Sequence, residues 1–397
     1  MIYLRKTILL SAIFLSLLAL YFLIPTSKEE SRKEQESMTD ETRAVFISYI
    51  ELKKYFYGKD KDVTQNTIDD MIENIDEYGL NTILLQVRSF SDAIYPSDIF
   101  PSSTMIVENV GDPLPLDILE YFIEATHKKG MKIHAWINPY RISSNNQDEI
   151  SPLSPAYKLK DTSAIKRIEN GIFYNPADKE VEELILSGIE EILDHYDVDG
   201  ILFDDYFYPD DTIDQENYEQ AKLENPDLTL SEFRLGVTSS LVKNTYQLVK
   251  GKDKNILFGI SPEGNIDNNY SKNYIDTKLF ASEDGYVDYL MPQIYFGFLN
   301  STKPFTNTLK EWDNLITASN VKLIPALAFY KAGQVDYYAK EGQDEWIQYN
   351  NIIMREVQAS RLVANYDGFS IFRYDSIFAD NLTENAFSEK ENLKKIL

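Results

Sequence analysis

Short apolar runs alternate with longer amphipathic stretches along most of this chain, from Arg43 onward. The apolar runs are 44–50, 82–87, 132–137, 200–203, 256–260, 289–294, 323–329 and 369–372. Between them, residues 65–78, 116–129, 179–195, 230–249, 305–319 and 345–364, with a shorter stretch near 274–281, show the apolar spacing of amphipathic helices. Eight strands in alternation with helices predict an α/β fold, the (β/α)8 barrel. A doubly wound open sheet is the alternative, although it usually contains fewer strands.

The first 25 residues have a different pattern. Arg5 and Lys6 precede an apolar run, 8–24, which Pro25 ends. The run is short for a membrane span and long for the core of a signal peptide, and bulky residues at 20–24 offer no small-residue cleavage site. We therefore expect residues 1–25 to form an uncleaved signal anchor, with the rest of the chain outside the cytoplasm. A cleaved secretory signal is the alternative.

The polar segment 26–42 contains almost no apolar residue, so we expect it to be a linker between the anchor and a barrel domain that spans 43–397. Hydrophobic residues make up 43% of the 397-residue chain, which excludes a disordered protein. The formal charge of −25 argues against binding to nucleic acid or to anionic lipid, so membrane contact is expected only through the N-terminal segment. Without cysteine there is no disulfide and no thiolate chemistry.

Polar and aromatic residues gather where the predicted strands end. In a (β/α)8 barrel the active site lies at the carboxyl ends of the strands. The residues at these ends, in chain order, are Glu51, Gln86, Arg88, Asp92, Asn138, Tyr140, Arg141, Asp204, Asp205, Tyr206, Glu263, Gln293, Tyr295, Tyr330, Arg373 and Asp375. Because a purely structural barrel does not require such side chains at one rim, the pattern predicts an enzyme.

The segment 199–209 is the most informative of these. An apolar strand leads directly into Asp204 and Asp205, and three aromatic residues follow. Carboxylates are costly to bury without partners, and acids beside aromatic rings are typical of sugar-binding clefts. The alternative is that the two acids cap the next helix or its approach loop.

Other chemistry has little support in the sequence. The three histidines, His127, His134 and His195, do not have the spacing of metal ligands, so no metal site and no cofactor are predicted. A polysaccharide deacetylase is disfavoured for the same reason.

Six segments resemble the bacterial glycosyl-hydrolase-like family 10 in the same order. They are 43–48, 85–97, 134–141, 199–209, 258–262 and 291–295. The resemblance implies a TIM barrel related to retaining glycoside hydrolases. It also implies a cell-wall polysaccharide as substrate, since a member of the family hydrolyses peptide-free peptidoglycan strands. Many members have Ser-Pro-Phe-Gly-Ile-Trp-Arg-Asn after the fifth strand, whereas this chain has Ser-Pro-Glu-Gly-Asn-Ile-Asp-Asn at 261–268.

Glycoside hydrolysis requires two carboxyl groups. Neighbouring residues of a strand point to opposite faces, so we do not expect Asp204 and Asp205 to be the two partners. A regular strand would place Leu202, Asp204 and Tyr206 toward the barrel axis, which makes Asp204 the predicted nucleophile or transition-state stabiliser. Glu263 is the predicted general acid/base, with the pKa raised by Asp204 and the surrounding rings, or else only a contact to sugar. Asp205 either orients a neighbour, binds a sugar hydroxyl or caps a helix or loop.

Glu51 and Asp375 are weaker candidates for the second acid. The predicted substrate-binding residues are Gln86, Arg88, Asp92, Asn138, Tyr140, Arg141, Tyr206, Gln293, Tyr295 and Arg373. The arginines suit carboxylate or N-acetyl oxygens, or pair with acids of the site, and the amides suit sugar hydroxyls. Trp136 is either a stacking platform or part of the core.

The sequence thus predicts an exported glycoside hydrolase of the retaining type whose partner is a cell-wall polysaccharide, above all the peptidoglycan glycan strand. The alternative is a carbohydrate-binding barrel without catalytic activity, attached to the cell surface.

Overall fold

The computed structural model describes residues 41–205 and 207–397. The predicted anchor, 1–25, and all but the last two residues of the predicted linker lie outside this part of the chain. Among the described residues, no helix has both the length and the apolar composition needed to cross a membrane. Residues Thr42–Leu397 form one compact unit.

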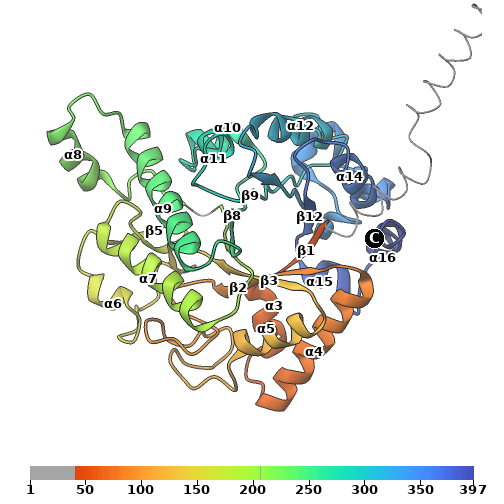
Figure 1. Cartoon of the computed structure of the whole chain (residues 1–397), viewed down its shortest axis with the longest axis horizontal. Coiled ribbons are helices and arrows are strands. Elements are labelled where there is room, and N and C mark those ends of the chain that lie inside the picture. The colour runs from red at the N-terminus through yellow and green to blue at the C-terminus, as the bar shows by residue number, and fades with distance from the viewer. Residues whose placement is uncertain (1–40, 206) are drawn as a thin grey trace, which may run out of the picture. The chain divides into compact units, whose positions relative to one another are not determined.

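Parallel strands form a curled sheet at the centre of this unit (Figure 1). The strands are β1 (Thr42–Ile47), β2 (Thr82–Arg88), β3 (Lys132–Ile137), β7 (Gly200–Phe203), β8 (Leu257–Ile260), β9 (Tyr289–Leu290), β10 (Lys322–Leu323), β11 (Ala326–Leu327) and β12 (Gly368–Ile371). Their order in the sheet is β10-β9-β8-β7-β3-β2-β1-β12-β11. Each predicted apolar run therefore contains a strand, and chain order is followed around the sheet.

The sheet closes because its two edge strands are pieces of one interrupted strand. β10 pairs with β9, whereas β11, which only two residues separate from β10, pairs with β12. The interruption contains Pro325, which has no N–H group to donate to a neighbouring strand. The described sheet thus has eight strand positions around a ring, as in a TIM barrel, and the predicted fold class is confirmed at this level.

Helices surround the ring, and α8 (Gln215–Glu224) projects away from it (Figure 1). They are α3 (Tyr49–Phe56), α4 (Lys61–Tyr78), α5 (Ile118–Lys128), α6 (Ala156–Leu159), α7 (Lys179–His195), α8 (Gln215–Glu224), α9 (Leu230–Lys252), α10 (Ile266–Ser271), α11 (Thr277–Ser282), α12 (Phe305–Leu315), α13 (Glu345–Gln348), α14 (Ile352–Ser360), α15 (Tyr374–Phe378) and α16 (Glu384–Lys394), with the 3-10 helices η1 (Phe329–Lys331) and η2 (Tyr337–Gly342). The strongly periodic stretch 179–195 is a helix over the predicted bounds.

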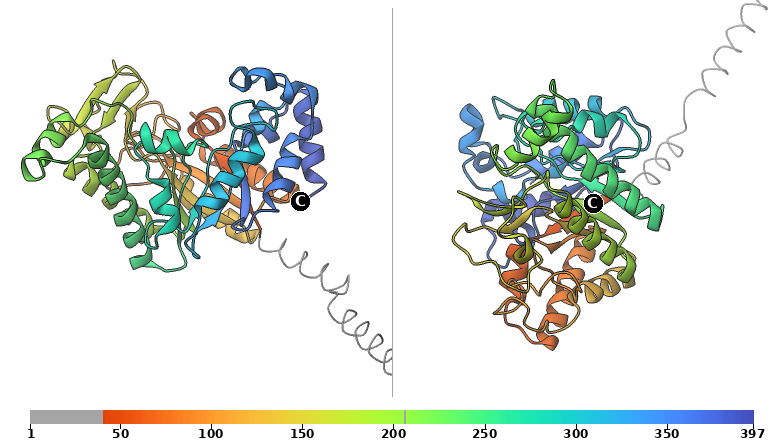
Figure 2. Two further views of the ribbon diagram at one scale, coloured as in Figure 1. Left: turned by 90° about the horizontal axis from the view of Figure 1, so that it is seen from above. Right: turned by 90° about the vertical axis from the view of Figure 1, so that its left-hand side faces the viewer.

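Several predictions from the periodicity need correction. The stretch 345–364 predicts one helix, but α13 ends at Gln348 and α14 begins only at Ile352. The first apolar run predicts a strand that continues to residue 50, but β1 ends at Ile47. Ser48 and Glu51 form a capping box that begins α3, so Glu51 belongs to a helix and not to a strand end. The stretch after β3 also contains an antiparallel sheet that no pattern indicates, made of β4 (Arg141–Ser143), β6 (Gly171–Tyr174) and β5 (Ile165–Ile168). This sheet and α8 lie on one side of the barrel (Figure 2).

Alternate residues of the strands point into the barrel and form an inner core distinct from the layer under the helices. The inner cluster contains Ala44, Phe46, Leu84, Trp136, Leu202, Tyr289, Met291, Ile324 and Ala326. Glycine is required at two inner positions. A Cβ atom on Gly200 would lie 2.6 Å from the His134 ring, and one on Gly259 would lie 2.2 Å from the Tyr289 ring.

Candidate active site

A cavity of about 260 Å³ opens at the carboxyl ends of the barrel strands. It is lined by Phe46, Ser48, Tyr49, Ile50, Gln86, Trp136, Arg141, Asp204, Asp205, Ser261, Gln293, Tyr295 and Phe372. Six of these are predicted site residues, namely Gln86, Arg141, Asp204, Asp205, Gln293 and Tyr295. The lining combines two carboxyl groups, two amides, one guanidinium group and several aromatic rings, which is the composition of a site that binds a polar ligand with flat apolar faces.

Asp204 lines this cavity, with only 4% of its surface exposed. Its Oδ2 atom accepts hydrogen bonds from Trp136 Nε1 at 3.1 Å and from Asn138 Nδ2 at 3.2 Å. The Asn138 Oδ1 atom accepts from the backbone N–H of Arg141 at 3.0 Å, which turns the amide N–H toward Asp204. Two donors aimed at one oxygen stabilise the ionised carboxylate and fix its direction. The expectation that Leu202 and Asp204 face the barrel axis is confirmed.

Asp205 lines the same cavity, although residue alternation predicts that the two aspartates point to opposite faces. The reason is local, since β7 ends at Phe203 and alternation does not continue beyond the strand. Burial raises the pKa of the Asp205 carboxyl, and the nearby charge of Glu263 raises it further. The hydrogen bond from Gln293 and the charge of Arg141 act in the opposite direction. The cavity therefore holds a carboxylate with fixed donors beside a carboxyl group that retains its proton more readily than usual.

Glu263 lies beside the cavity but not in its lining. Its Oε1 atom accepts a hydrogen bond from Asn268 Nδ2 at 2.7 Å and its Oε2 atom one from Asn273 Nδ2 at 3.5 Å. The backbone at Glu263 forms a bridge with Gln293, a residue that does line the cavity. The predicted acid/base is thus held by two side-chain amides, close enough to Asp205 for their charges to interact.

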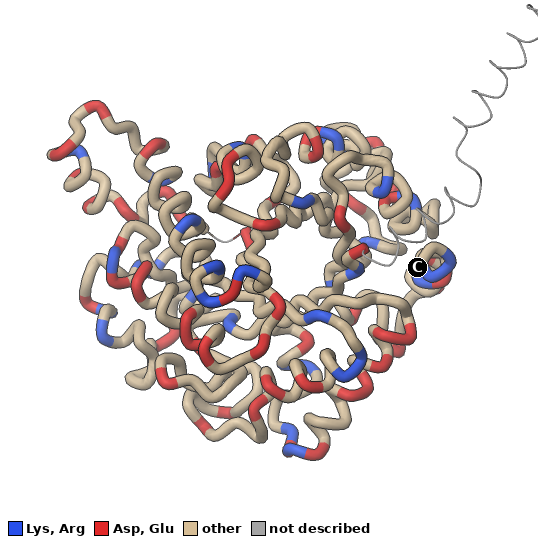
Figure 3. The backbone as a smooth tube through the Cα atoms, in the orientation of Figure 1, with Lys and Arg blue, Asp and Glu red and all other residues tan. Residues whose placement is uncertain are grey.

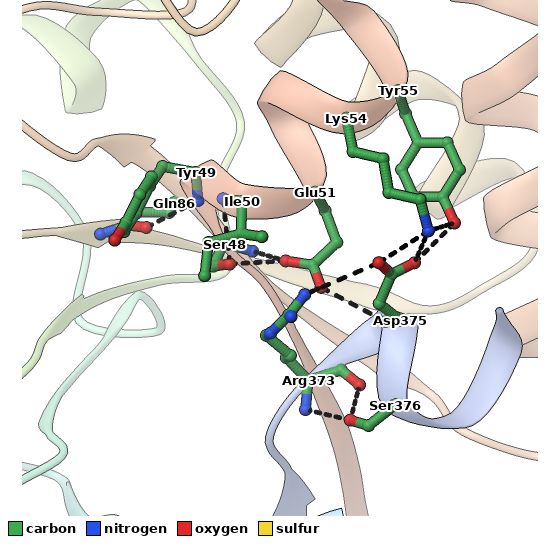
Figure 4. Close-up of polar contacts among 10 residues, drawn as sticks. All are labelled: Ser48, Tyr49, Ile50, Glu51, Lys54, Tyr55, Gln86, Arg373, Asp375 and Ser376. Carbon is green, nitrogen blue, oxygen red and sulfur yellow. Dashed lines mark hydrogen bonds and ion pairs between the residues drawn. The ribbon is translucent and has the colours of Figure 1, made fainter. Parts of the chain in front are cut away.

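The other polar residues of the cavity are held by backbone groups and rings. Arg141 Nε donates to the Ser89 carbonyl oxygen at 3.2 Å, and its guanidinium lies 4.6 Å from the Phe90 ring centre. Gln293 Nε2 donates to the Ser261 carbonyl oxygen at 3.0 Å. Gln86 Oε1 accepts from the backbone N–H of Tyr49 at 2.9 Å (Figure 4). Each of these side chains therefore has a fixed orientation before any ligand binds.

Several predicted residues lie elsewhere. Arg88 should share the inner face with Gln86, but the pairing of β2 with β3 shifts between these two residues. This β-bulge turns Arg88 outward, where its guanidinium lies 4.0 Å from the Phe100 ring centre. Tyr140 is buried in the core. Asp92 lines a neighbouring hollow, and Tyr206 lies outside the described residues.

Arg373, Glu51 and Asp375 form an ion-pair cluster at the junction of β1 and β12 (Figure 4). The fully buried Glu51 is hydrogen-bonded to Ser48 and paired with Arg373. Asp375 accepts from Lys54 Nζ at 2.8 Å and from the Tyr55 hydroxyl at 2.5 Å. None of the three lines the cavity, and Arg373 is held in an ion pair with Glu51. This geometry does not favour Glu51 or Asp375 as the second acid, and the substrate contact of Arg373 stays a prediction.

Some lining residues are not predicted from the sequence. The sequence leaves two roles for Trp136, a stacking platform or a core residue. In the structure its indole N–H donates a hydrogen bond to Asp204, the predicted nucleophile. A signal for this contact exists, because Trp136 is two residues before Asn138 and so shares its face of the strand. Phe46, Ser48, Tyr49, Ile50, Ser261 and Phe372 have no comparable signal as ligand contacts.

Within residues 41–205 and 207–397, no group of three or more His, Cys, Asp or Glu side chains is arranged to hold a metal ion. Acidic residues are spread around the whole ring of helices (Figure 3).

Comparison with known proteins agrees with this geometry. Glycosyl hydrolase DigH of Escherichia coli K12 is 27% identical over 339 residues, which cover 79% of this chain and 76% of the relative. Glycosyl hydrolase YngK of Bacillus subtilis strain 168 is 32% identical over 282 residues, which cover 66% of this chain and 55% of the relative.

Solved structures show the same fold at low sequence identity. The glycoside hydrolase domain of PgaB (BpsB) from Bordetella bronchiseptica matches with a TM-score of 0.60 at 13% identity, over 89% of this chain and 99% of that domain. The catalytic domain of β-amylase from Paenibacillus polymyxa matches with a TM-score of 0.52 at 10% identity, over 90% and 98% of the two chains. The family model of Glycosyl hydrolase-like 10 matches residues 41–347, and this chain belongs to that family.

Proposed function

We propose that this protein is a glycoside hydrolase that cleaves a polysaccharide of the bacterial cell wall, in particular the glycan strand of peptidoglycan. The observation that carries the proposal is Asp204, a buried carboxylate at the carboxyl end of β7, aimed into the cavity by Trp136 and Asn138. The relatives named as glycosyl hydrolases support the reaction class. The choice of peptidoglycan rests on the family resemblance of the sequence motifs.

In the proposed mechanism Asp204 acts on the anomeric carbon, as a nucleophile in the retaining route. The hydrogen bonds from Trp136 and Asn138 hold its carboxylate in one orientation toward the cavity. A protonated acid must deliver a proton to the leaving oxygen and, in the second step, remove one from water. Asp205 suits this role better than Glu263, because it lines the cavity and burial raises its pKa.

Sugar binding is assigned to the aromatic and amide lining. The rings of Trp136, Tyr295 and Phe372 offer flat apolar surfaces to the faces of a sugar ring. Gln86 and Gln293 are fixed amides that suit hydroxyl or N-acetyl groups. Arg141 adds a positive charge to an otherwise acidic site.

The test is incubation of the purified protein with wall glycan strands stripped of peptides, followed by mass spectrometry of the products. The proposal expects shorter strands, and the Asp204→Asn variant should leave the strands at full length under the same conditions. If the wild-type protein binds the strands but leaves them intact, its function is carbohydrate binding without catalysis.

We further propose that the protein is exported and held at the membrane by residues 1–25, as their charge and apolar pattern suggest. Fractionation of cells, with N-terminal sequencing of the protein, tests this. Retention in the membrane fraction with Met1 or its neighbours present supports the anchor. A soluble extracellular form that lacks residues 1–25 would show a cleaved signal.

A further inference from the structure

A second hollow of about 200 Å³ lies beside the catalytic cavity. It is bounded by the loop after β2 and by the insertion after β3 that contains β4 and β6. Apolar side chains, among them Met105, Ile142 and Ile172, form part of its wall, and several serine hydroxyls form much of the rest. Apolar surface interleaved with hydroxyl groups suits a sugar ring, which has an apolar face and a polar edge.

Asp92 is the residue that distinguishes this hollow from an ordinary surface depression. Only 8% of its surface is exposed, and it lines the hollow. Within the described part of the chain its Oδ1 atom is buried and has no hydrogen-bond partner. Burial raises the pKa of this carboxyl to about 6, while hydrogen bonds to the carboxyl group from the Ser103 side chain and the Phe90 backbone and the charges of Arg88 and Arg141 act to lower it. A buried oxygen without a partner is costly, and a ligand hydroxyl or amine that reaches Oδ1 removes the cost.

The two cavities share a wall. Phe90 lines the hollow, whereas Tyr49 and Arg141 line the catalytic cavity. The Phe90 ring lies 5.6 Å from the Tyr49 ring and 4.6 Å from the Arg141 guanidinium. One layer of side chains therefore separates the two spaces, so they lie within the distance of neighbouring sugars in a glycan.

The charges around the hollow restrict what it can bind. Three acidic residues line it, Asp92, Asp148 and Glu149, and among the described residues no lysine or arginine does. An acidic sugar would be repelled by these carboxylates, whereas an uncharged or amine-bearing sugar would not be.

We propose that this hollow is an accessory subsite that binds a non-acidic pyranose residue of the glycan next to the bond that is cut, with Asp92 as its hydrogen-bonding group. The inference rests on the proposed function, because it assumes that the neighbouring cavity holds a sugar. It implies that the enzyme acts better on oligosaccharides long enough to fill both spaces.

The test compares two variants of the same loop. Thr104 lines the hollow and is half-buried, so Thr104→Trp should fill it. Glu108 is exposed, lies four residues further along, and does not line the hollow, so Glu108→Trp is the matched control. We expect Thr104→Trp to lower kcat/KM by about 10- to 100-fold on oligosaccharides long enough to fill both spaces, and not on those that fill only the catalytic cavity. Glu108→Trp should behave as wild type on both.

Equal losses by Thr104→Trp on short and long substrates, or no loss, would overturn the proposal. A binding measurement separates this failure from failure of the proposed function. In the Asp204→Asn background, calorimetry with an oligosaccharide of the peptide-stripped wall glycan, long enough to fill both spaces, should show weaker binding when Thr104→Trp is added and no change when Glu108→Trp is added. This comparison is decisive even if the wild-type protein hydrolyses nothing, and equal affinities would reject the subsite.

Discussion

The barrel has a cavity at each end, and the two are nearly the same size. The one at the carboxyl ends of the strands has a volume of about 260 Å³, and the one at the opposite end about 250 Å³. The first is lined by Asp204, Asp205 and fixed amides. The second is lined by His134, Tyr289, two lysines, Asp288, Asp367 and several apolar residues. Volume alone therefore does not identify the functional end.

What differs is where the polar groups are directed. At the opposite end, His134 Nδ1 shares a hydrogen bond of 2.9 Å with the Tyr289 hydroxyl, and Asp288 pairs with Lys250 at 2.7 Å. Burial lowers the pKa of His134 to about 4, so the ring is neutral at pH 7. His134 and Tyr289 thus satisfy each other, and the charge of Asp288 is neutralised by Lys250. At the carboxyl ends of the strands, Asp204 and Asp205 face a common space. This arrangement favours that end of the barrel as the one that performs chemistry.

The largest expected effect comes from Asp204→Asn. The change keeps the size of the side chain but removes the charge that stabilises the reacting sugar. We expect kcat to fall by about 1,000-fold or more, with little change in the free energy of unfolding. The comparison at the other end is His134→Gln, which should lower stability and leave kcat unchanged. Steady-state kinetics and urea unfolding of both variants measure the two quantities. A near-normal rate for Asp204→Asn would show that Asp204 takes no part in the mechanism.

Asp205→Asn should have the next largest effect, about a 100-fold loss of kcat. Because burial raises the pKa of Asp205, the protonated form persists to higher pH, and the rate should fall as pH rises through that pKa. This limb of the pH–rate profile should be absent in the variant. An activated aryl glycoside, whose leaving group needs no proton, should restore much of the first step. If Glu263→Gln shows this pattern and Asp205→Asn does not, Glu263 is the acid.

At the opposite end the expected effect is on stability. The pKa of His134 is lowered from 6.5 to about 4, so the unfolded chain binds more protons than the folded one between these values. The contribution of His134 to stability should therefore decrease as pH falls from about 6.5 to 4, by roughly 3 kcal/mol. Urea unfolding at several pH values should show that the wild type loses this much more stability than His134→Gln over that range. Equal slopes for the two proteins would contradict the burial of a neutral histidine.

The smallest expected effects are changes in the free energy of unfolding when either of two glycines is replaced by alanine. Gly259→Ala would place a Cβ atom 2.2 Å from the Tyr289 ring and should lower the free energy of unfolding by about 2 kcal/mol. Gly236 lies inside α9, and beyond the backbone of that helix no described atom comes within 4 Å of the place that a Cβ atom would take. Gly236→Ala should therefore raise stability by about 0.5–1 kcal/mol. Thermal unfolding measures both changes, and opposite signs are the expected outcome.

Most of the barrel could be predicted from the sequence because its signals are repetitive. The helix Lys179–His195 and the strand Lys132–Ile137 have the predicted bounds, since long periodic runs and short apolar runs are strong patterns. The predictions failed where one local interaction overrides the pattern. Ser48 and Glu51 end the first strand early through a capping box, and Pro325 divides the seventh apolar run into two short strands.

The candidate site was predictable only in part. Asp204 follows a buried strand, and that position predicted that it lies at the carboxyl ends of the strands and points toward the barrel axis. Asp205 points into the cavity because β7 ends at Phe203. Arg88 points away from the cavity because of the bulge in β2. Neither a strand end nor a bulge can be located to one residue from apolar spacing, and a shift of one residue reverses the face of a side chain.

The pairing of the first strand with the last has a consequence for how the chain folds. β1 pairs with β12 from Thr42 opposite Gly368, and Arg43 donates a hydrogen bond at 3.0 Å to the carbonyl oxygen of Leu397. Glu51 and Arg373 add an ion pair across the same junction. During synthesis, β1 therefore has an unpaired edge until residue 368 has been made, and contacts this distant in sequence form slowly. An open strand edge invites pairing with other chains, so premature release favours aggregation over a partly active barrel.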